Sequence, residues 1–374
     1  KKLPRYILPA GLPCPALREL GLATETRAGS SMASLLQPLP TLTAAPCSST
    51  HAPSRSRRAA GAVIVRCSRA RAADGGRGGS ADDYHATLRT LNSKGARRTP
   101  RKSLGQHYML DPSVNEQLSS IGEIKEGDVV LEIGPGTGSL TNVLINAGAT
   151  VIAVEKDPRM AALVRDRFVG DDRLVILQED FTKCHICPYI THLLENKKST
   201  GRDIRYAKVV SNIPFNISTD IIKRLLPLGD IFSDVVLLLQ DETALRLVDS
   251  SSQTSEYRPI NVFVNFYSDA EYRFKVERTN FFPQPNVDAA VVTFKLKVSL
   301  DYPEVVSIKG FFSMVNSAFN GKRKMLRNSL QHLCTSLEIE EALKNAGLAA
   351  TSRPEELSLD DFVRLHNLLA KLHS

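Results

Sequence analysis

The sequence predicts an α/β protein whose core is a doubly wound, Rossmann-like parallel sheet, followed by a small C-terminal helical domain. Short apolar runs alternate with stretches of helical periodicity through the middle of the chain, which is the pattern of parallel strands joined by helices. A glycine-rich turn directly follows the first of these runs, as it does at the ligand-binding edge of such sheets. From about Tyr302 onward, apolar residues recur only at helical spacing.

Local signals define the individual elements. Asp111 is the expected N-cap of an opening helix, and Pro112 suits its first position. Apolar runs predict strands at 128–133, 150–154, 174–177, 208–211 and 234–239. Helices are predicted from the glycine turn to about 147 and over 158–168, 217–226 and 241–248. Alternation predicts later strands over 257–274 and 290–297, and helical spacing predicts about four short helices after 302.

The composition is that of a globular protein with an unevenly distributed charge. A net charge of +8, with 24% charged and 42% hydrophobic residues, excludes wholesale disorder. No apolar run approaches ~18 residues, so no membrane partner is expected. Residues 1–80 hold 12 basic and 3 acidic residues, 81–102 hold 6 and 2, and 103–374 hold 30 and 35. Because the body is net acidic, nucleic-acid contact there requires local basic clusters.

The basic N-terminal segment resembles an organellar targeting sequence. From Met32 to Ala73 there is no Asp or Glu, while Arg, Ser, Thr, Ala and Pro dominate. The start at Met32 resembles a plant chloroplast precursor, and Val65–Cys67 resembles a stromal processing site. A mitochondrial signal and a disordered RNA-holding arm are the alternatives. The expected divisions are an extension upstream of the native start, a chloroplast transit peptide and a flexible basic linker, at 1–31, 32–67 and 68–101.

The glycine turn predicts a nucleoside-containing cofactor. Gly134, Gly136 and Gly138 let a ligand approach the backbone closely, because glycine lacks a Cβ. Glu155 ends the second strand ~20 residues on, where its carboxylate can accept hydrogen bonds from two ribose hydroxyls. The third glycine comes one residue earlier than in the dinucleotide fingerprint, which favours S-adenosylmethionine over NAD. A tight strand–helix turn is the alternative.

Two further strand ends carry candidate ligand-binding groups. Asp180, just past the third strand, can accept from a cofactor adenine, although a turn or helix cap is the alternative. After the fourth strand, the Asn212 side-chain oxygen and a carbonyl near Pro214 can bind both hydrogens of an adenine N6 amine. This draws its lone pair out of conjugation toward a methyl donor. Phe215 offers a stacking face worth ~1–3 kcal/mol, and a strand-ending turn with a core aromatic is the alternative.

Five ordered motifs resemble the ribosomal-RNA adenine N6,N6-dimethyltransferase family. They are the segments 102–109, 132–138, 212–215, 281–288 and 319–328. The resemblance covers about 102–362 and implies a class I methyltransferase fold with S-adenosylmethionine as cofactor. It also implies dimethylation of two adjacent adenines near the 3′ end of small-subunit rRNA.

The resemblance further implies roles for individual residues. The implied cofactor contacts are His107, Met109, Gly134, Gly136, Glu155, Asp180 and Asn212. The implied catalytic residues, which hold the target adenine, are Asn212, Pro214, Phe215 and, on the other face of the base, Phe281. The residues expected to contact RNA are Lys102, Lys322, Arg323, Lys324 and Arg327, with a solvated charged face as the alternative.

Two departures from the family pattern weaken specific contacts. Phe215 stands where the family often has tyrosine, so a hydroxyl is lost while the stacking face is kept. Lys322 stands where many members have arginine, which loses a bidentate phosphate donor.

The Cys-x-x-Cys at Cys184 and Cys187 does not predict a metal site, because no second pair lies at zinc spacing. These cysteines are interpreted as loop residues, and no role is assigned to 185–205. Six irregularly spaced cysteines in a chain of this length suit a reducing compartment.

The sequence therefore predicts an enzyme of the chloroplast stroma that dimethylates plastid 16S rRNA. Residues 102–300 form the expected methyltransferase domain, and 301–374 the expected helical RNA-binding domain. The expected partner is small-subunit rRNA within a pre-ribosomal particle, bound by a monomer. The alternatives are a mitochondrial member, a large-subunit rRNA methylase, and a non-catalytic ribosome-assembly or organellar transcription factor.

Overall fold

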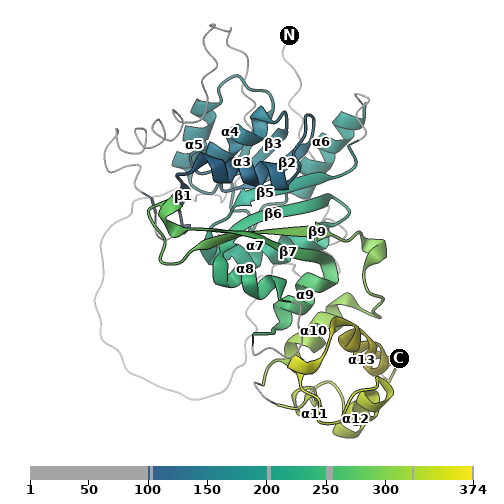
Figure 1. The fold of residues 1–374 in the computed structure, drawn as a ribbon. Coiled ribbons are helices and arrows are strands. Elements are labelled where there is room, and N and C mark those ends of the chain that lie inside the picture. The colour runs from purple at the N-terminus through teal and green to yellow at the C-terminus, as the bar shows by residue number, and fades with distance from the viewer. Residues whose placement is uncertain (1–99, 102–103, 200–203, 250–255, 322–323, 373–374) are drawn as a thin grey trace, which may run out of the picture.

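A seven-stranded sheet forms the centre of the computed structural model, which describes residues 100–101, 104–199, 204–249, 256–321 and 324–372 (Figure 1). The strands lie in the order β4, β3, β2, β5, β6, β9, β7. The first five are parallel, and the last two add antiparallel pairs at one edge. Their bounds are β2 Val129–Ile133, β3 Thr150–Val154, β4 Leu174–Leu177, β5 Ala207–Asn212, β6 Phe232–Gln240, β7 Ser268–Val276 and β9 Ala289–Leu296. The α/β class is confirmed.

Helices cover both faces of this sheet, as a doubly wound fold requires. Successive strand residues point to opposite faces, so Val130 packs among one set of helices and Leu131 among the other. The first set is α3 (Pro112–Ile121), α4 (Ser139–Asn146) and α5 (Pro158–Arg167). The second set includes α6 (Cys187–Ser199), α7 (Ser218–Leu225) and α8 (Asp241–Val248). The ligand-binding loops consequently emerge between two helical layers, at the carboxyl ends of the parallel strands.

The N-cap prediction at the first described helix is confirmed. The Asp111 side chain accepts a hydrogen bond from the Ser113 N–H at 2.9 Å, and Pro112 occupies the first helical position. The predicted strands and helices between 128 and 248 agree with the observed ones to within about two residues at their ends. Helix α6 was not predicted, and it falls in the stretch to which no role was assigned.

The prediction of strand structure over 257–274 is confirmed from Ser268 onward and is wrong before it. Residues Pro259–Tyr267 form helix α9, and strand β7 begins only at Ser268. Pro259 occupies the first helical position, and the Asn261 side chain accepts from the Arg258 N–H at 2.9 Å, which are helix-start signals. The aromatic and β-branched residues of α9 suit a strand locally. Burial between the sheet and the C-terminal helices instead selects the helix.

The expected C-terminal helices are present and share the core of the sheet. They are α10 (Ile308–Ala318), α11 (Leu326–Ser329), α12 (Ser336–Asn345) and α13 (Leu359–Lys371). Phe311 on α10 contacts Phe266 on α9 with ring centroids 5.3 Å apart, and Phe312 contacts Phe263 at 5.2 Å. One continuous apolar cluster therefore runs from the sheet into these helices. The extension, transit-peptide and linker predictions at 1–99 lie outside the described residues.

A second, two-stranded sheet brings distant segments together beside the main one. Strand β1 (Tyr108–Met109) pairs antiparallel with β8 (Phe281–Phe282), so Tyr108 lies opposite Phe282 and Met109 opposite Phe281. This pairing fixes the segment before α3 against the loop that follows β7. None of the helices in the described ranges combines the length and apolar character that crossing a bilayer requires.

Candidate functional site

A cleft opens at the carboxyl ends of β2, β3, β4 and β5, where the order of strands reverses between β2 and β5. It encloses about 1060 Å³ of empty space, its open mouth included. Most of the predicted cofactor and catalytic residues line it, namely His107, Met109, Gly134, Gly136, Glu155, Asp180, Asn212, Pro214 and Phe215. Phe281 is not among the lining residues.

The glycine turn forms the floor of the cleft in a conformation that other residues rarely adopt. Gly134 and Gly136 have φ angles of 71° and 56°. A Cβ on Gly136 would lie 3.1 Å from the Tyr108 ring, so a side chain there would press on β1. The bare backbone leaves space for a ligand to approach the turn.

Glu155 is a buried carboxylate held by backbone donors at the end of β3. Its Oε1 accepts from the Asp157 N–H at 2.7 Å and its Oε2 from the Gly136 N–H at 3.3 Å. The side chain is 6% exposed, and burial raises the pKa of Glu155 to about 7. Two hydroxyl donors from a ribose would favour the charged form, so the position suits a nucleoside.

Asp180 occupies the β4 side of the cleft and already has partners. Its Oδ1 accepts from the Thr182 hydroxyl at 2.7 Å, and its Oδ2 lies 2.9 Å from the Lys156 Nζ. Burial acts to raise the pKa of Asp180, but the hydrogen bonds from Thr182 and Lys156 outweigh it and leave the pKa lowered. A carboxylate at this edge can accept from an exocyclic amine.

Asn212 ends β5, and a neighbouring serine fastens this strand end to β2. Ser211 Oγ accepts from the Ile133 N–H at 3.1 Å and donates to the Ile133 carbonyl at 2.6 Å. Pro214, with φ of −59° and ψ of 125°, then turns the chain so that Asn212 and Phe215 both face the cleft. The Pro214 carbonyl accepts from the Ile217 N–H at 3.3 Å.

His107 and Phe215 form a stacked aromatic pair in the cleft. Their ring centroids lie 5.7 Å apart with an interplanar angle of 24°. The His107 Nδ1 lies 2.7 Å from the Pro283 carbonyl, which can only accept, so Nδ1 carries the proton. Phe281 meets Phe215 edge-on at 6.4 Å and is 2% exposed. The structure thus places Phe281 behind Phe215 in the core, where it supports that ring and does not line the cleft.

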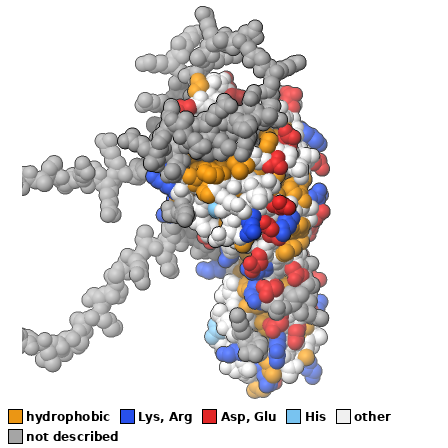
Figure 2. All heavy atoms as spheres, turned by 60° about the vertical axis from the view of Figure 1, so that its left-hand side comes forward, with side chains coloured by type: hydrophobic (Ala, Val, Ile, Leu, Met, Phe, Trp, Pro, Cys, Tyr) orange, Lys and Arg blue, Asp and Glu red, His pale blue; other side chains and the backbone are white. Residues whose placement is uncertain are grey.

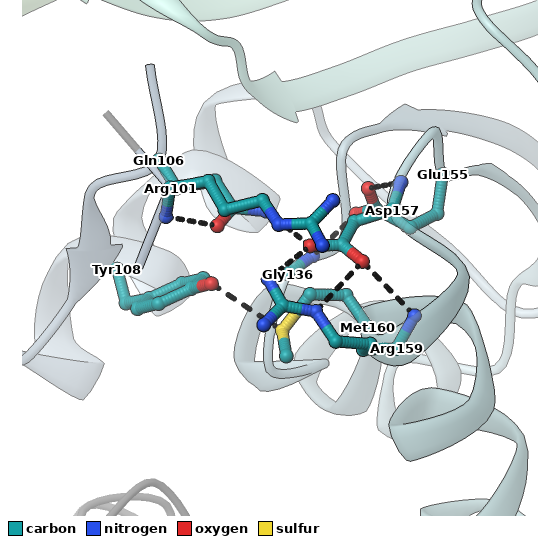
Figure 3. A network of polar contacts seen from close by, with 8 residues as sticks. All are labelled: Arg101, Gln106, Tyr108, Gly136, Glu155, Asp157, Arg159 and Met160. Atoms are coloured by element: carbon teal, nitrogen blue, oxygen red, sulfur yellow. Dashed lines mark hydrogen bonds and ion pairs between the residues drawn. The ribbon is translucent and has the colours of Figure 1, made fainter. Parts of the chain in front are cut away.

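A polar network that the sequence did not predict ties the segment before β1 to the cleft (Figure 3). Gln106 accepts from the Arg101 N–H at 2.9 Å and donates to Asp157 Oδ2 at 3.3 Å. Arg159 donates to the same oxygen at 2.7 Å, and its hydrogen bond is the main reason that the pKa of Asp157 is lowered to about 2. The Asp157-Pro158 pair, an N-cap followed by proline, was the signal that could have found Asp157.

Glu132 is a second buried carboxylate on the cleft wall, 1% exposed. Its Oε2 accepts from the Thr141 hydroxyl at 2.6 Å. Burial raises the pKa of Glu132 to about 8, although the Thr141 hydrogen bond opposes this. The side chain is therefore mostly protonated at neutral pH. Periodicity alone identified it only as part of a strand.

The predicted RNA-binding residues are only partly described. Lys102, Lys322 and Arg323 lie outside the described residues. Lys324 is exposed, and Arg327 lies 2.8 Å from Glu340 in an ion pair. Acidic and basic side chains are interspersed over the C-terminal helices, at the bottom of the view in Figure 2.

Cys184 and Cys187 are both buried, and neither forms a disulfide within the part of the chain that the structure describes. Cys184 follows the Asp180 turn, and Cys187 begins α6, so only the first is a loop residue as predicted. Burial raises the pKa of the Cys184 thiol.

Comparisons with known proteins agree on one family. A family model described as "Ribosomal RNA adenine dimethylase" matches residues 97–371. The "Ribosomal RNA small subunit methyltransferase, chloroplastic" of Arabidopsis thaliana is 67% identical over 78% of this chain and 84% of its own. The "Ribosomal RNA small subunit methyltransferase A" of Protochlamydia amoebophila is 35% identical over 72% of this chain and 91% of its own.

Solved structures show the same fold at low identity. A dimethyladenosine transferase from Plasmodium falciparum has a TM-score of 0.55 at 23% identity, over 69% of this chain and 95% of its own. The 23S rRNA methyltransferase ErmE has a TM-score of 0.52 at 23% identity, over 70% of this chain and 99% of its own. The class I methyltransferase architecture predicted from the sequence is confirmed.

Proposed function

The chain belongs to the ribosomal RNA adenine dimethylase family, and from this premise we propose that it dimethylates N6 of two adjacent adenines near the 3′ end of plastid 16S rRNA. The observation that carries the proposal is the shared cleft, in which Glu155, the glycine turn and Asn212 meet at one edge of the sheet. Glu155 and the glycine turn suit the binding of a nucleoside, and Asn212 suits an amine that accepts methyl groups. The product supports small-subunit biogenesis.

The residues of the cleft fit S-adenosylmethionine as the cofactor. A Cβ on Gly136 would press on the Tyr108 ring, which lines the cleft, whereas glycine leaves that wall undisturbed. Glu155 would bind the ribose and Asp180 would bind the adenine. His107, Met109 and Gly134 would contact the rest of the cofactor. When bound, this cofactor supplies a methyl group on a positively charged sulfur.

Asn212, Pro214 and Phe215 would hold the target base. The Asn212 amide oxygen and a carbonyl beside Pro214 accept the two N6 hydrogens, which makes the nitrogen lone pair available for attack. Asn212 and the carbonyl beside Pro214 would thereby aim the N6 lone pair at the methyl group that the bound cofactor would supply. Phe215 would stack on the base, and Phe281, which meets Phe215 edge-on from the core, would hold that ring in place. The base must leave its own stack to reach this cleft.

We place this activity in the chloroplast stroma. Two observations support the compartment: the acid-free composition of 32–67 and the chloroplastic name of the Arabidopsis relative. Small-subunit rRNA within a pre-ribosomal particle is the proposed partner of a monomer, with Lys102, Lys322, Arg323, Lys324 and Arg327 as proposed RNA contacts. These side chains would neutralise backbone phosphates.

Methyl transfer to unmodified small ribosomal subunits tests the proposal directly. The full chain and labelled S-adenosylmethionine should produce dimethyladenine near the 3′ end of the small-subunit rRNA. Asn212→Ala should lower the rate by at least ~100-fold, because it removes an acceptor aimed at the reacting amine. Asn196→Ala, on the exposed face of α6, is the matched control and should leave the rate unchanged. Cofactor binding without any transfer would contradict the proposal.

A further inference from the structure

Asn115 is a buried polar residue with an unsatisfied acceptor. The residue is 2% exposed, and its Oδ1 has no hydrogen-bond partner in the described part of the protein. Buried amide oxygens are nearly always paired, and an orphan in a native structure often marks the place of a ligand or water. Asn115 also lines the cleft. The residue that carries the orphaned oxygen is therefore part of the wall of the candidate site.

The position of Asn115 along α3 places it beside the end of β5. Gly122, at the other end of α3, packs on the Val210 side chain, which a Cβ on Gly122 would approach to 3.1 Å. At 1.5 Å per residue, Asn115 lies about 10 Å further along the helix axis. Since Asn115 and Asn212 line the same cleft, α3 runs back along β5 toward the carboxyl edge.

The order of the strands indicates which end of the cofactor faces Asn115. Asp180 and Glu155 follow β4 and β3, so the nucleoside occupies that side of the cleft. The reactive methyl must lie near Asn212, at the end of β5. The amino-acid end of the cofactor must then lie on the β2–β5 side of the cleft, which α3 borders.

We propose that Asn115 binds the amino-acid end of S-adenosylmethionine, with its Oδ1 accepting a hydrogen bond from the α-ammonium group. This inference rests on the proposed function, because it takes the cofactor from it. An ammonium is a donor without acceptor capacity, and it satisfies an orphaned amide oxygen with a charge-assisted hydrogen bond. Asn115 is thus a positioning residue for the methyl donor.

Two cofactor analogues separate this role from a structural one. S-adenosylhomocysteine carries the amino-acid end, and 5′-methylthioadenosine lacks both its ammonium and its carboxylate. Calorimetric titration of the full chain with each analogue gives two dissociation constants for every variant. Asn115→Leu replaces the amide with an apolar group of similar shape, and Asn115→Ala serves if leucine overpacks the site. Ser119→Ala, one turn along the same helix face, is the control for disturbance of α3.

In Asn115→Leu, the affinity for S-adenosylhomocysteine should fall about 10-fold, while that for 5′-methylthioadenosine stays within about twofold. Ser119→Ala should leave the ratio of the two constants unchanged. Equal losses for both analogues, or no loss for either, would overturn the inference while leaving the proposed function standing. A wild-type chain that binds neither analogue would overturn the proposed function as well.

Discussion

The side chain of Gln106 donates a hydrogen bond from its Nε2 to Oδ2 of Asp157, 3.3 Å away. Asp157 is the N-cap of α5 and lies two residues after Glu155, whose carboxylate accepts its N–H. The segment that enters β1 is therefore anchored to the same turn that holds the expected ribose site (Figure 3). This contact joins residues far apart in the sequence and fixes one wall of the cleft.

Asp157→Ala should weaken both the fold and the cofactor site. Loss of the N-cap should cost about 1 kcal/mol of unfolding free energy in urea denaturation, and loss of the Gln106 anchor should weaken S-adenosylhomocysteine binding several-fold. Asp171→Ala is the matched control, since Asp171 makes the same backbone and guanidinium contacts with Arg173 away from the cleft. Equal effects of the two variants on binding would contradict the anchoring role.

The Asp157 carboxylate should make the free energy of unfolding depend on pH in the acidic range. The folded pKa of Asp157 is lowered to about 2, below its ordinary value near 4, so the unfolded state takes up protons first. The stabilisation is present above pH ~4 and is lost as the pH falls through about 2. As the pH falls from ~4 to about 2, the free energy of unfolding measured by urea denaturation should decrease less in Asp157→Ala than in the wild type.

Cofactor affinity should rise with pH through neutrality because of Glu155. Burial raises the pKa of Glu155 to about 7, and its charged form is the better acceptor for ribose hydroxyls. S-adenosylhomocysteine should therefore bind several-fold more tightly at pH 8 than at pH 6, by calorimetric titration. Glu155→Gln, which cannot titrate, should bind weakly with a flat profile. A wild-type profile without slope would contradict a ligand-binding Glu155 with a raised pKa.

Glu132 should affect the pH dependence of the free energy of unfolding, whereas Glu155 should affect that of cofactor binding. Its folded pKa, raised to about 8, exceeds its ordinary value, so the folded state retains a proton that the unfolded state releases. The stabilisation is complete below pH ~4.5 and is lost as the pH rises toward about 8. Glu132→Gln keeps an acceptor for Thr141 and should gain unfolding free energy relative to the wild type between pH 5 and 8. A constant difference over this range would contradict the buried proton.

Alanine at two left-handed glycines should separate backbone strain from steric blockage. Gly136 and Gly170 have φ angles of 56° and 91°, so each Gly→Ala change should cost roughly 1 kcal/mol or more of unfolding free energy. A Cβ on Gly170 would have no neighbour within 4 Å, whereas one on Gly136 would press on Tyr108. Only Gly136→Ala should also weaken S-adenosylhomocysteine binding, as measured by titration. Similar binding by both variants would mean that β1 moves aside at no cost.

The two adjacent phenylalanines of β8 should respond differently to truncation. Phe281 is 2% exposed and packs in the core, so Phe281→Ala should cost about 3–5 kcal/mol in urea denaturation. Phe282 is 38% exposed, and its truncation should cost less than about 1 kcal/mol. If Phe281→Ala folds normally but no longer methylates RNA, the stacking role is supported over the core role.

The sequence predicted the sheet well because its strand runs are apolar and bounded by turns. The strand prediction over α9 is wrong because its aromatic and β-branched residues also suit a strand. Burial against the C-terminal helices, together with the helix start at Pro259, selects the helix. The polar residues at strand ends could be placed at one edge by topology alone. Asn115 and Gln106 could not, because their importance depends on contacts between segments that are distant in the chain.

The Ser211 hydroxyl takes the place of backbone pairing between the ends of β2 and β5. Strands β2 and β5 pair directly only at Val130–Lys208 and Leu131–Val209, and beyond that point Ser211 supplies both hydrogen bonds to Ile133. The two strands can separate there without leaving a buried N–H or carbonyl unpaired. The Ser211 hydroxyl thus bridges β2 and β5 where their direct backbone pairing ends, at the edge of the sheet where the methyl donor and the acceptor base are expected to meet.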